Sequence, residues 1–162
     1  MVHSTRGTLG VNFTATEATT ANKAFELNHE EPGSNGADYV YTRAGGAVAA
    51  GDVVSILVDG TVAAITTTTA SVGSAVGFAQ TAIAAFSFGW VALRGPNLQV
   101  NVLAACAPEV MLFTTSTAGH LDDATVTLGL VEGVMTQAAA TANATAHTAI
   151  CAYPHISRHL MA

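Results

Sequence analysis

The chain has 162 residues, of which 50% are hydrophobic, 10% charged and 6% aromatic, and its net charge is −6. Its length suits one domain, and its five Lys and Arg residues are too few for the basic surface that binds a nucleic-acid backbone or anionic lipid. The most apolar window, residues 71–93, is interrupted by small polar residues and glycines, so we expect no membrane-spanning helix.

The charged residues are unevenly distributed. No Asp, Glu, Lys or Arg occurs between Asp59 and Arg94, and none occurs between Glu132 and Arg158. An ordinary soluble domain has about 25% charged residues. Much of this surface is therefore expected to consist of Ala, Thr, Gly, Ser and Val, which protect poorly against association. We interpret the chain as a component of an assembly and not as a freely diffusing enzyme.

Residues 1–22 are rich in Thr, Ala, Asn and Gly and show little hydrophobic periodicity. This pattern predicts an extended N-terminal arm, followed by one β-domain over residues 23–162. Val11 and Phe13 are apolar side chains that could anchor such an arm to a neighbour. The alternative is a terminus without an anchor.

From residue 23 onward, short β-prone segments alternate with turn residues. Residues 52–59 and 61–66 flank Asp59-Gly60, which is a two-residue hairpin signal. Further turns are expected at residues 32–36 and 95–97, where Gly, Pro and Asn cluster. The other predicted strands are residues 24–29, 38–42, 75–82, 89–94, 98–103, 110–115, 127–135 and 147–153.

The spacing of these strands is typical of an all-β fold. We predict a single antiparallel β-sandwich, jelly-roll-like, or a small β-barrel. Residues 138–149 are rich in Ala, but Thr and Asn interrupt them and no apolar stripe forms, so a loop or strand is expected there. Cys106 and Cys151 lie in apolar segments and are expected to be buried thiols, with a single disulfide between them as the alternative.

Motifs for covalent catalysis and for phosphate binding are absent. The sequence contains no G-x-S-x-G nucleophile elbow, no P-loop and no G-x-G-x-x-G. We therefore predict that the chain is not an enzyme and that it has no catalytic residue, no cofactor and no bound metal.

One spacing near the C-terminus could still indicate a zinc-dependent hydrolase. Cys151, His155 and His159 recur every four residues and would line one face of a helix. Pro154 and the strand-like segment before it argue against that helix. A tail with partly exposed histidines is the expected outcome.

The carboxylates form two adjacent pairs, Glu30-Glu31 and Asp122-Asp123. Adjacent residues of a strand point to opposite faces, so neither pair forms an acid–base site by spacing alone. Asp122 and Asp123 would supply only part of a calcium ligand set. His120 could pair with either aspartate, although a simple turn histidine is expected.

Trp90 is the only tryptophan and lies near Phe78, Phe86 and Phe88 in the sequence. Such a group either fills the core between sheets or anchors an interface. The predicted interface residues are Val11, Phe13, Phe86, Phe88 and Trp90.

Several segments resemble a known family. They are residues 44–54 (AGGAVAAGDVV), 76–80 (VGFAQ), 88–95 (FGWVALRG), 106–110 (CAPEV) and 112–123 (LFTTSTAGHLDD). This pattern resembles the small β-rich capsid decoration, or cement, proteins of tailed bacteriophages, over roughly residues 24–136. The matching motifs are turns and strands and carry no chemistry.

The resemblance implies a virion structural protein on the outer capsid surface, assembled in the host cytoplasm. Such proteins bind as dimers or trimers and clamp neighbouring subunits of the major capsid protein. The partners expected are therefore the major capsid protein and further copies of this chain, with no nucleic acid and no membrane. The alternative is a trimeric β-rich domain of a phage fibre or a carbohydrate-binding module, for which aromatic residues are few.

Overall fold

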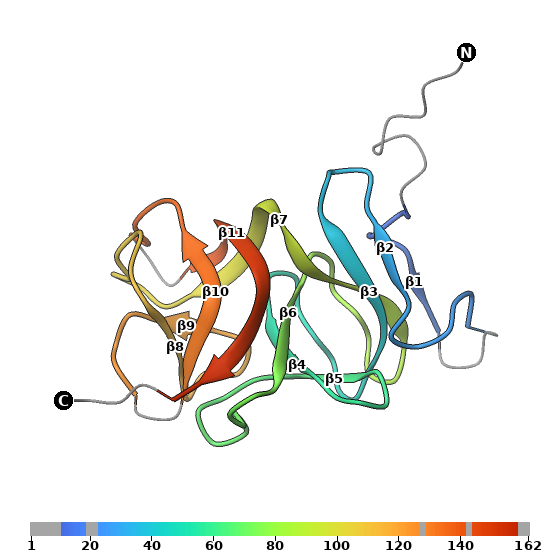
Figure 1. The fold of residues 1–162 in the computed structure, drawn as a ribbon, viewed down its shortest axis with the longest axis horizontal. Helices are drawn as coiled ribbons and strands as arrows, with labels where there is room; N and C mark the ends of the chain where they lie inside the picture. Colours follow the sequence, from blue (N-terminus) through green and yellow to red (C-terminus); the bar gives the residue numbers. More distant parts are fainter. Residues whose placement is uncertain (1–10, 19–22, 127–128, 142–143, 159–162) are drawn as a thin grey trace, which may run out of the picture.

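The computed structural model describes residues 11–18, 23–126, 129–141 and 144–158 (Figure 1). Within these residues every regular element is a β-strand, and no helix has the length and apolar character that crossing a membrane requires. The prediction of an all-β protein is confirmed. The strands are β1 (Thr16–Glu17), β2 (Glu30–Pro32), β3 (Asp38–Ala44), β4 (Val53–Ile56), β5 (Thr61–Ala64), β6 (Ala75–Ala79), β7 (Phe88–Val102), β8 (Leu112–Thr114), β9 (Leu121–Asp122), β10 (Leu130–Thr136) and β11 (Ala144–Ser157).

In the described part of the chain, these strands form one sheet that closes on itself in two places. Strand β7 pairs with β3 and β6, and the pairs β3–β5, β5–β4 and β4–β6 complete a first ring, here called the N-terminal ring. Strand β7 also pairs with β9 and β11, and β8 and β10 complete the C-terminal ring. The two rings lie side by side along the long axis of the molecule, with β7 shared between them (Figure 1).

The sheet is mixed, which differs from the predicted antiparallel sandwich or barrel. Strands β3 and β5 are parallel, as are β7 and β9. The first pairing is parallel because the chain reverses direction twice, once between β3 and β4 and again in the β4–β5 hairpin. Strand β9 meets β7 through one residue pair, Val102 and Leu121, so the C-terminal ring is not a regular barrel.

The predicted hairpin is confirmed, although its strands are shorter than expected. Strands β4 and β5 pair antiparallel, with Val54 opposite Ala64 at one end of the ladder and Ile56 opposite Val62 at the other. The turn depends on Gly60, whose φ is 76°. A Cβ at this position would lie 2.6 Å from Cβ of Leu27, so the close approach of the two segments requires glycine.

The turn predicted at residues 95–97 is wrong, because these residues lie inside the 15-residue strand β7. Asn97 has a φ of 54°, and partner strand β11 shifts register between Ala149 and Cys151. The turn residues are thus absorbed as a β-bulge that bends one long strand. Two predicted strands, 89–94 and 98–103, are therefore continuous.

The structure also differs from or decides the expectation for two other segments. Residues 24–29 form no strand, and Phe25 instead lies against Tyr41 and Trp90. Residues 144–149 belong to β11, as the strand alternative for 138–149 expected. Both outcomes reflect contacts made across the molecule and not local propensity.

The core has two hydrophobic clusters. Strands β3, β4, β6 and β7 send alternate residues to each of them, so that Tyr41 joins the larger cluster and Val40 the smaller one. All residues of the smaller cluster belong to the N-terminal ring or its loops. The larger cluster continues through both rings, where it includes Leu112 and Val131. In the N-terminal ring, side chains on both faces of the sheet are consequently buried.

Candidate interaction surface

Residues 11–18, which fall within the predicted arm, pack against other segments of their own chain. The amide of Val11 donates to the carbonyl of Pro32 at 3.1 Å, and β1 pairs with the start of β7. The ring of Phe13 stacks on that of Tyr39, with centroids 5.0 Å apart. Both predicted anchors thus have partners within this chain, and the rest of the predicted arm, residues 1–10 and 19–22, lies outside the described residues.

The aromatic group around Trp90 is part of the core. Trp90 is 3% exposed and contacts Tyr41 and Phe25 at centroid distances of 5.1 and 5.0 Å. Phe88 is half-buried and stacks on Tyr41 at 6.0 Å. The Tyr41 hydroxyl donates to Glu17 at 2.7 Å, and burial together with this carboxylate raises the pKa of Tyr41 to about 12. Phe25 and Tyr41, which the sequence did not suggest, complete the group.

Phe86 differs from the other predicted interface residues, because it is 52% exposed. Its φ is 63°, a left-handed conformation that is unfavourable for a bulky residue. The guanidinium of Arg43 lies over its ring, 5.6 Å from the centroid, and Arg43 Nε donates to the Phe86 carbonyl at 3.4 Å. Phe86 and Arg43 together are called the Phe86–Arg43 knob below.

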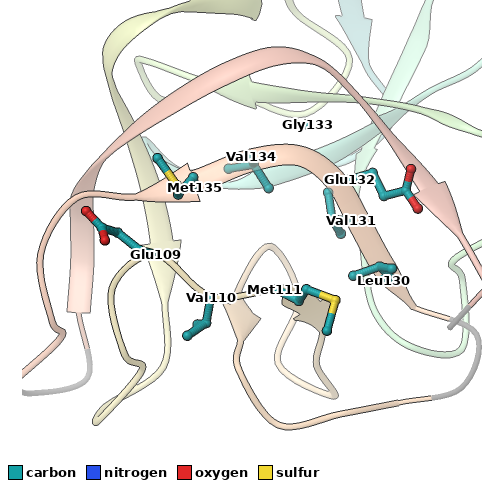
Figure 2. A pocket seen from close by; sticks show the side chains of 9 residues that line it. All are labelled: Glu109, Val110, Met111, Leu130, Val131, Glu132, Gly133, Val134 and Met135. Carbon is teal, nitrogen blue, oxygen red and sulfur yellow. The ribbon is translucent and has the colours of Figure 1, made fainter. Parts of the chain in front are cut away.

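A hollow lies at the other end of the molecule, between the loop before β8 and strand β10. Its volume is about 340 Å³, and residues Glu109–Met111 and Leu130–Met135 line it. Met111 is 57% exposed and Met135 is 40% exposed. Glu109 and Glu132 lie at opposite ends of the hollow, with the apolar side chains between them (Figure 2). This site is called the Met111–Met135 hollow.

The apolar surface continues from this hollow onto β11. A second hollow of about 270 Å³ shares Gly133–Met135 with the first and is also lined by Ile150, Cys151 and Ala152. Ile150 is 41% exposed. Exposed apolar residues within paired strands indicate a sheet face that the described part of the chain leaves uncovered.

A bulge between β10 and β11 turns Tyr153 outward. The register shifts between Glu132 and Val134, where Gly133 has a φ of 82° and Tyr153 has a φ of 49°. Tyr153 is 52% exposed, and the Arg94 guanidinium lies 5.8 Å from its ring centroid. Bulges commonly redirect a side chain in this way, and such strain is found at functional sites.

A possible metal-ligand group includes Asp122 and Asp123, the two carboxylates that the sequence offered as part of a calcium ligand set. The ligand atoms of Cys106, Asp122 and Asp123 all lie within 4.8 Å of one another. Burial, and then the two carboxylates, raise the pKa of the Cys106 thiol to about 11. Calcium takes six to eight oxygen ligands and a thiol is not one of them, so the group does not fit the calcium alternative that the two aspartates suggested. Sequence reasoning missed Cys106 because only the return of β9 to β7 brings it here.

The residues with zinc-like spacing do not share a helical face, because Cys151 and His155 lie on strand β11. Cys151 is 2% exposed, whereas His155 is exposed and lies 3.4 Å from Glu132. His159 lies outside the described residues. The prediction that both cysteines are buried thiols is confirmed, and they do not form a disulfide.

The remaining polar candidates have local partners. His120 Nδ1 lies 3.0 Å from the carbonyl of Ala118 and is not bonded to the aspartates in the contacts observed. Glu31 pairs with His29 at 3.1 Å on the surface. Among the described residues, these contacts do not place a nucleophilic side chain beside a general base.

The sequence was also compared with known proteins. Neither the family models nor the curated proteins give a match to this chain.

Proposed function

We propose that this chain is a structural subunit of a tailed-phage virion that binds the outer capsid surface as an oligomer and cements neighbouring major capsid subunits. The proposal rests on the family resemblance of residues 44–123 and on the character of the surface. It assigns the chain no chemistry: its work is to bury its own surface against other subunits.

The observation that carries the proposal is the surface formed by the uncharged segment between Asp59 and Arg94. This segment includes β5, β6 and the start of β7, and most of its exposed residues lie in turns and loops. Its exposed residues are Ala63, Thr68, Thr69, Ser71, Val72, Gly73, Ala75, Ala82, Ala84, Ala85 and Phe86. A surface of this kind has no ionic groups to keep neighbouring proteins apart, so close packing against another subunit costs little desolvation of charge.

The mechanism is additive. A typical stable interface buries about 800 Å² on each partner, and apolar area removed from water contributes about 25 cal/mol per Å² before the costs of association. A shell repeats the same contact at every equivalent position. A modest gain per copy therefore raises the resistance of the whole shell to heat and internal pressure.

Shell binding is the direct test. The purified chain is mixed with empty shells assembled from the major capsid protein that its own genome encodes. We expect it to sediment with the shells in a fixed ratio to capsid subunits and to raise the temperature at which they disrupt. Free chain in the supernatant and unchanged shell disruption would contradict the proposal, and binding to a panel of oligosaccharides instead would favour the carbohydrate-binding alternative.

A further inference from the structure

Two features of the surface are complementary. The Phe86–Arg43 knob presents an aromatic ring beside a positive charge, and the Met111–Met135 hollow presents methionine side chains between two negative charges. We propose that the knob of one copy inserts into the hollow of a second copy of this chain. The inference deepens the proposed function, on which it rests for the need to form an assembly, by naming the contact between copies.

The knob has the properties of an interface anchor. Phe86 is half exposed and held in a left-handed conformation, which persists only where the surrounding structure enforces it. Its amide donates to the carbonyl of Ala44 at 2.8 Å, so the strained turn is fixed to the end of β3. Because the ring is already held in place, little conformational entropy is lost when a partner covers it.

The hollow suits this anchor in shape and charge. A volume of about 340 Å³ is that of a small ligand pocket and accommodates an aromatic ring. Methionine side chains adapt to an aromatic partner and make favourable sulfur contacts with it. Among the described residues, no Lys or Arg lines the hollow, whereas Glu109 and Glu132 flank it at opposite ends, so Arg43 would approach one of these carboxylates when Phe86 enters.

The positions of the two features favour a head-to-tail contact. In the N-terminal ring, Arg43 lies in β3 and Phe86 in the loop before β7, and in the C-terminal ring the hollow lies between the loop before β8 and strand β10. Strand β3 lies toward one end of the long axis, and β8 and β10 lie toward the other (Figure 1). Each copy thus offers a knob at one end and a hollow at the other. A contact between unlike patches closes into a ring when the rotation between copies permits it.

The first test measures self-association without any shell. Light scattering after size-exclusion chromatography gives the mass of the wild-type chain over a wide range of concentration. We expect oligomers that dissociate as salt is raised, because Arg43 and the two glutamates are solvent-accessible in the free chain. A wild-type chain that stays monomeric at every concentration overturns the inference, while shell binding by that same monomer would leave the capsid-binding part of the proposed function intact.

The knob variant is Phe86→Gly. Glycine adopts a φ of 63° without strain, so the variant loses the ring but keeps or gains folding stability. We expect association to weaken by at least tenfold. The matched control is Val58→Ser, since Val58 is 97% exposed and belongs to neither patch. Equal association of the Phe86→Gly and wild-type chains overturns the inference.

The hollow variant is Met111→Arg, which fills the hollow with a longer side chain and brings a positive charge close to the approaching Arg43. It too should associate at least tenfold more weakly than the wild type. An equimolar mixture of Phe86→Gly and Met111→Arg retains one intact knob and one intact hollow, so it should form one-to-one heterodimers that neither variant forms alone. Native mass spectrometry of differently labelled chains detects them. If no heterodimers form, the knob-in-hollow contact is overturned. Non-specific association, in contrast, would not depend on combining an intact knob with an intact hollow.

Discussion

The two rings share β7 but differ in how their faces are covered. In the N-terminal ring, alternate residues of β3, β4, β6 and β7 enter two hydrophobic clusters, and the exposed apolar residues, such as Val58 and Phe86, lie in turns. In the C-terminal ring, only the larger cluster is present, and Met135, Ile150 and Tyr153 are exposed within strands. We infer that the first ring supplies most of the stability and makes contacts through its turns, whereas the second makes contacts through a strand face that is less covered.

The largest expected effect is truncation of the buried aromatic residue of the N-terminal ring. Trp90→Ala should lower the free energy of unfolding by about 3–5 kcal/mol, since the cavity would lie among Phe25 and Tyr41. Denaturant unfolding followed by circular dichroism measures it. The control in the other ring is Met135→Ala, which should change stability by no more than about 0.5 kcal/mol. Similar losses for both variants would remove the distinction between the rings.

The junction between the rings gives the next largest effect. Gly119, in the loop between β8 and β9, has a φ of 73°, and a Cβ there would lie 2.5 Å from Cγ of the buried Asp52. Asp52 accepts from the Ala49 amide at 2.8 Å and from Asn101 at 3.0 Å. Gly119→Ala should therefore destabilise the chain by about 2–3 kcal/mol.

The matched control for this substitution is Gly46→Ala. Gly46 has no atom within 4 Å of a built Cβ, and its φ is not in the left-handed region. Its stability should stay within about 0.5 kcal/mol of wild type. If unfolding of the Gly119 variant occurred in two separate transitions, the rings would be independent units, and the shared core would not couple them.

A smaller effect is expected for the exposed face of the C-terminal ring. Ile150→Ser should leave unfolding almost unchanged but weaken binding to shells or to other copies by about tenfold, equivalent to ~1.4 kcal/mol. The comparison variant is Val58→Ser, which removes a turn residue that is 97% exposed. Equal binding by the two variants would show that an apolar residue exposed within a strand contributes no more to binding than one exposed in a turn.

The smallest effect at neutral pH concerns the thiols. Burial raises the pKa of Cys106 to about 11 and that of Cys151 to about 12, from an ordinary value of 9.0. Between pH 9 and 11 the folded chain therefore holds more protons than the unfolded chain, so stability is fully present below pH 9 and falls as the pH rises. Melting temperatures across this range measure the loss.

Replacing both cysteines with Ala should flatten this alkaline dependence, leaving the part due to Tyr39 and Tyr41, whose pKa values burial raises to about 12. At pH 8 neither thiol of the folded chain should react with iodoacetamide, because both are buried and protonated. Rapid alkylation under native conditions would show that the strands around Cys106 or Cys151 open readily.

Local patterns in the sequence predicted part of this fold. The β4–β5 hairpin follows from Asp59-Gly60 between β-branched segments, because that dipeptide fixes a tight turn through nearest neighbours alone. The burial of both cysteines follows from their apolar surroundings. In contrast, Gly95-Pro96-Asn97 has the composition of a turn, and only pairing of β11 with β7 makes it a bulge.

The candidate surface was less accessible to sequence reasoning. Phe86 was a predicted interface residue, but nothing in its neighbours distinguished it from Trp90, which the structure buries. Met111, Met135 and Ile150 read as ordinary strand residues, since alternation does not show which face of a strand remains uncovered. Only their position in the C-terminal ring, which lacks the second cluster, leaves them exposed.

Composition and short-range pattern were enough to predict the all-β class, the hairpin, the buried thiols and the scarcity of surface charge, because each depends on composition or on residues adjacent in the chain. Pairing between distant strands, in contrast, makes β7 common to two rings, makes β3 and β5 parallel, and leaves particular apolar residues exposed. Those features depend on hydrogen bonds between residues far apart in sequence, whose free energy no local pattern encodes.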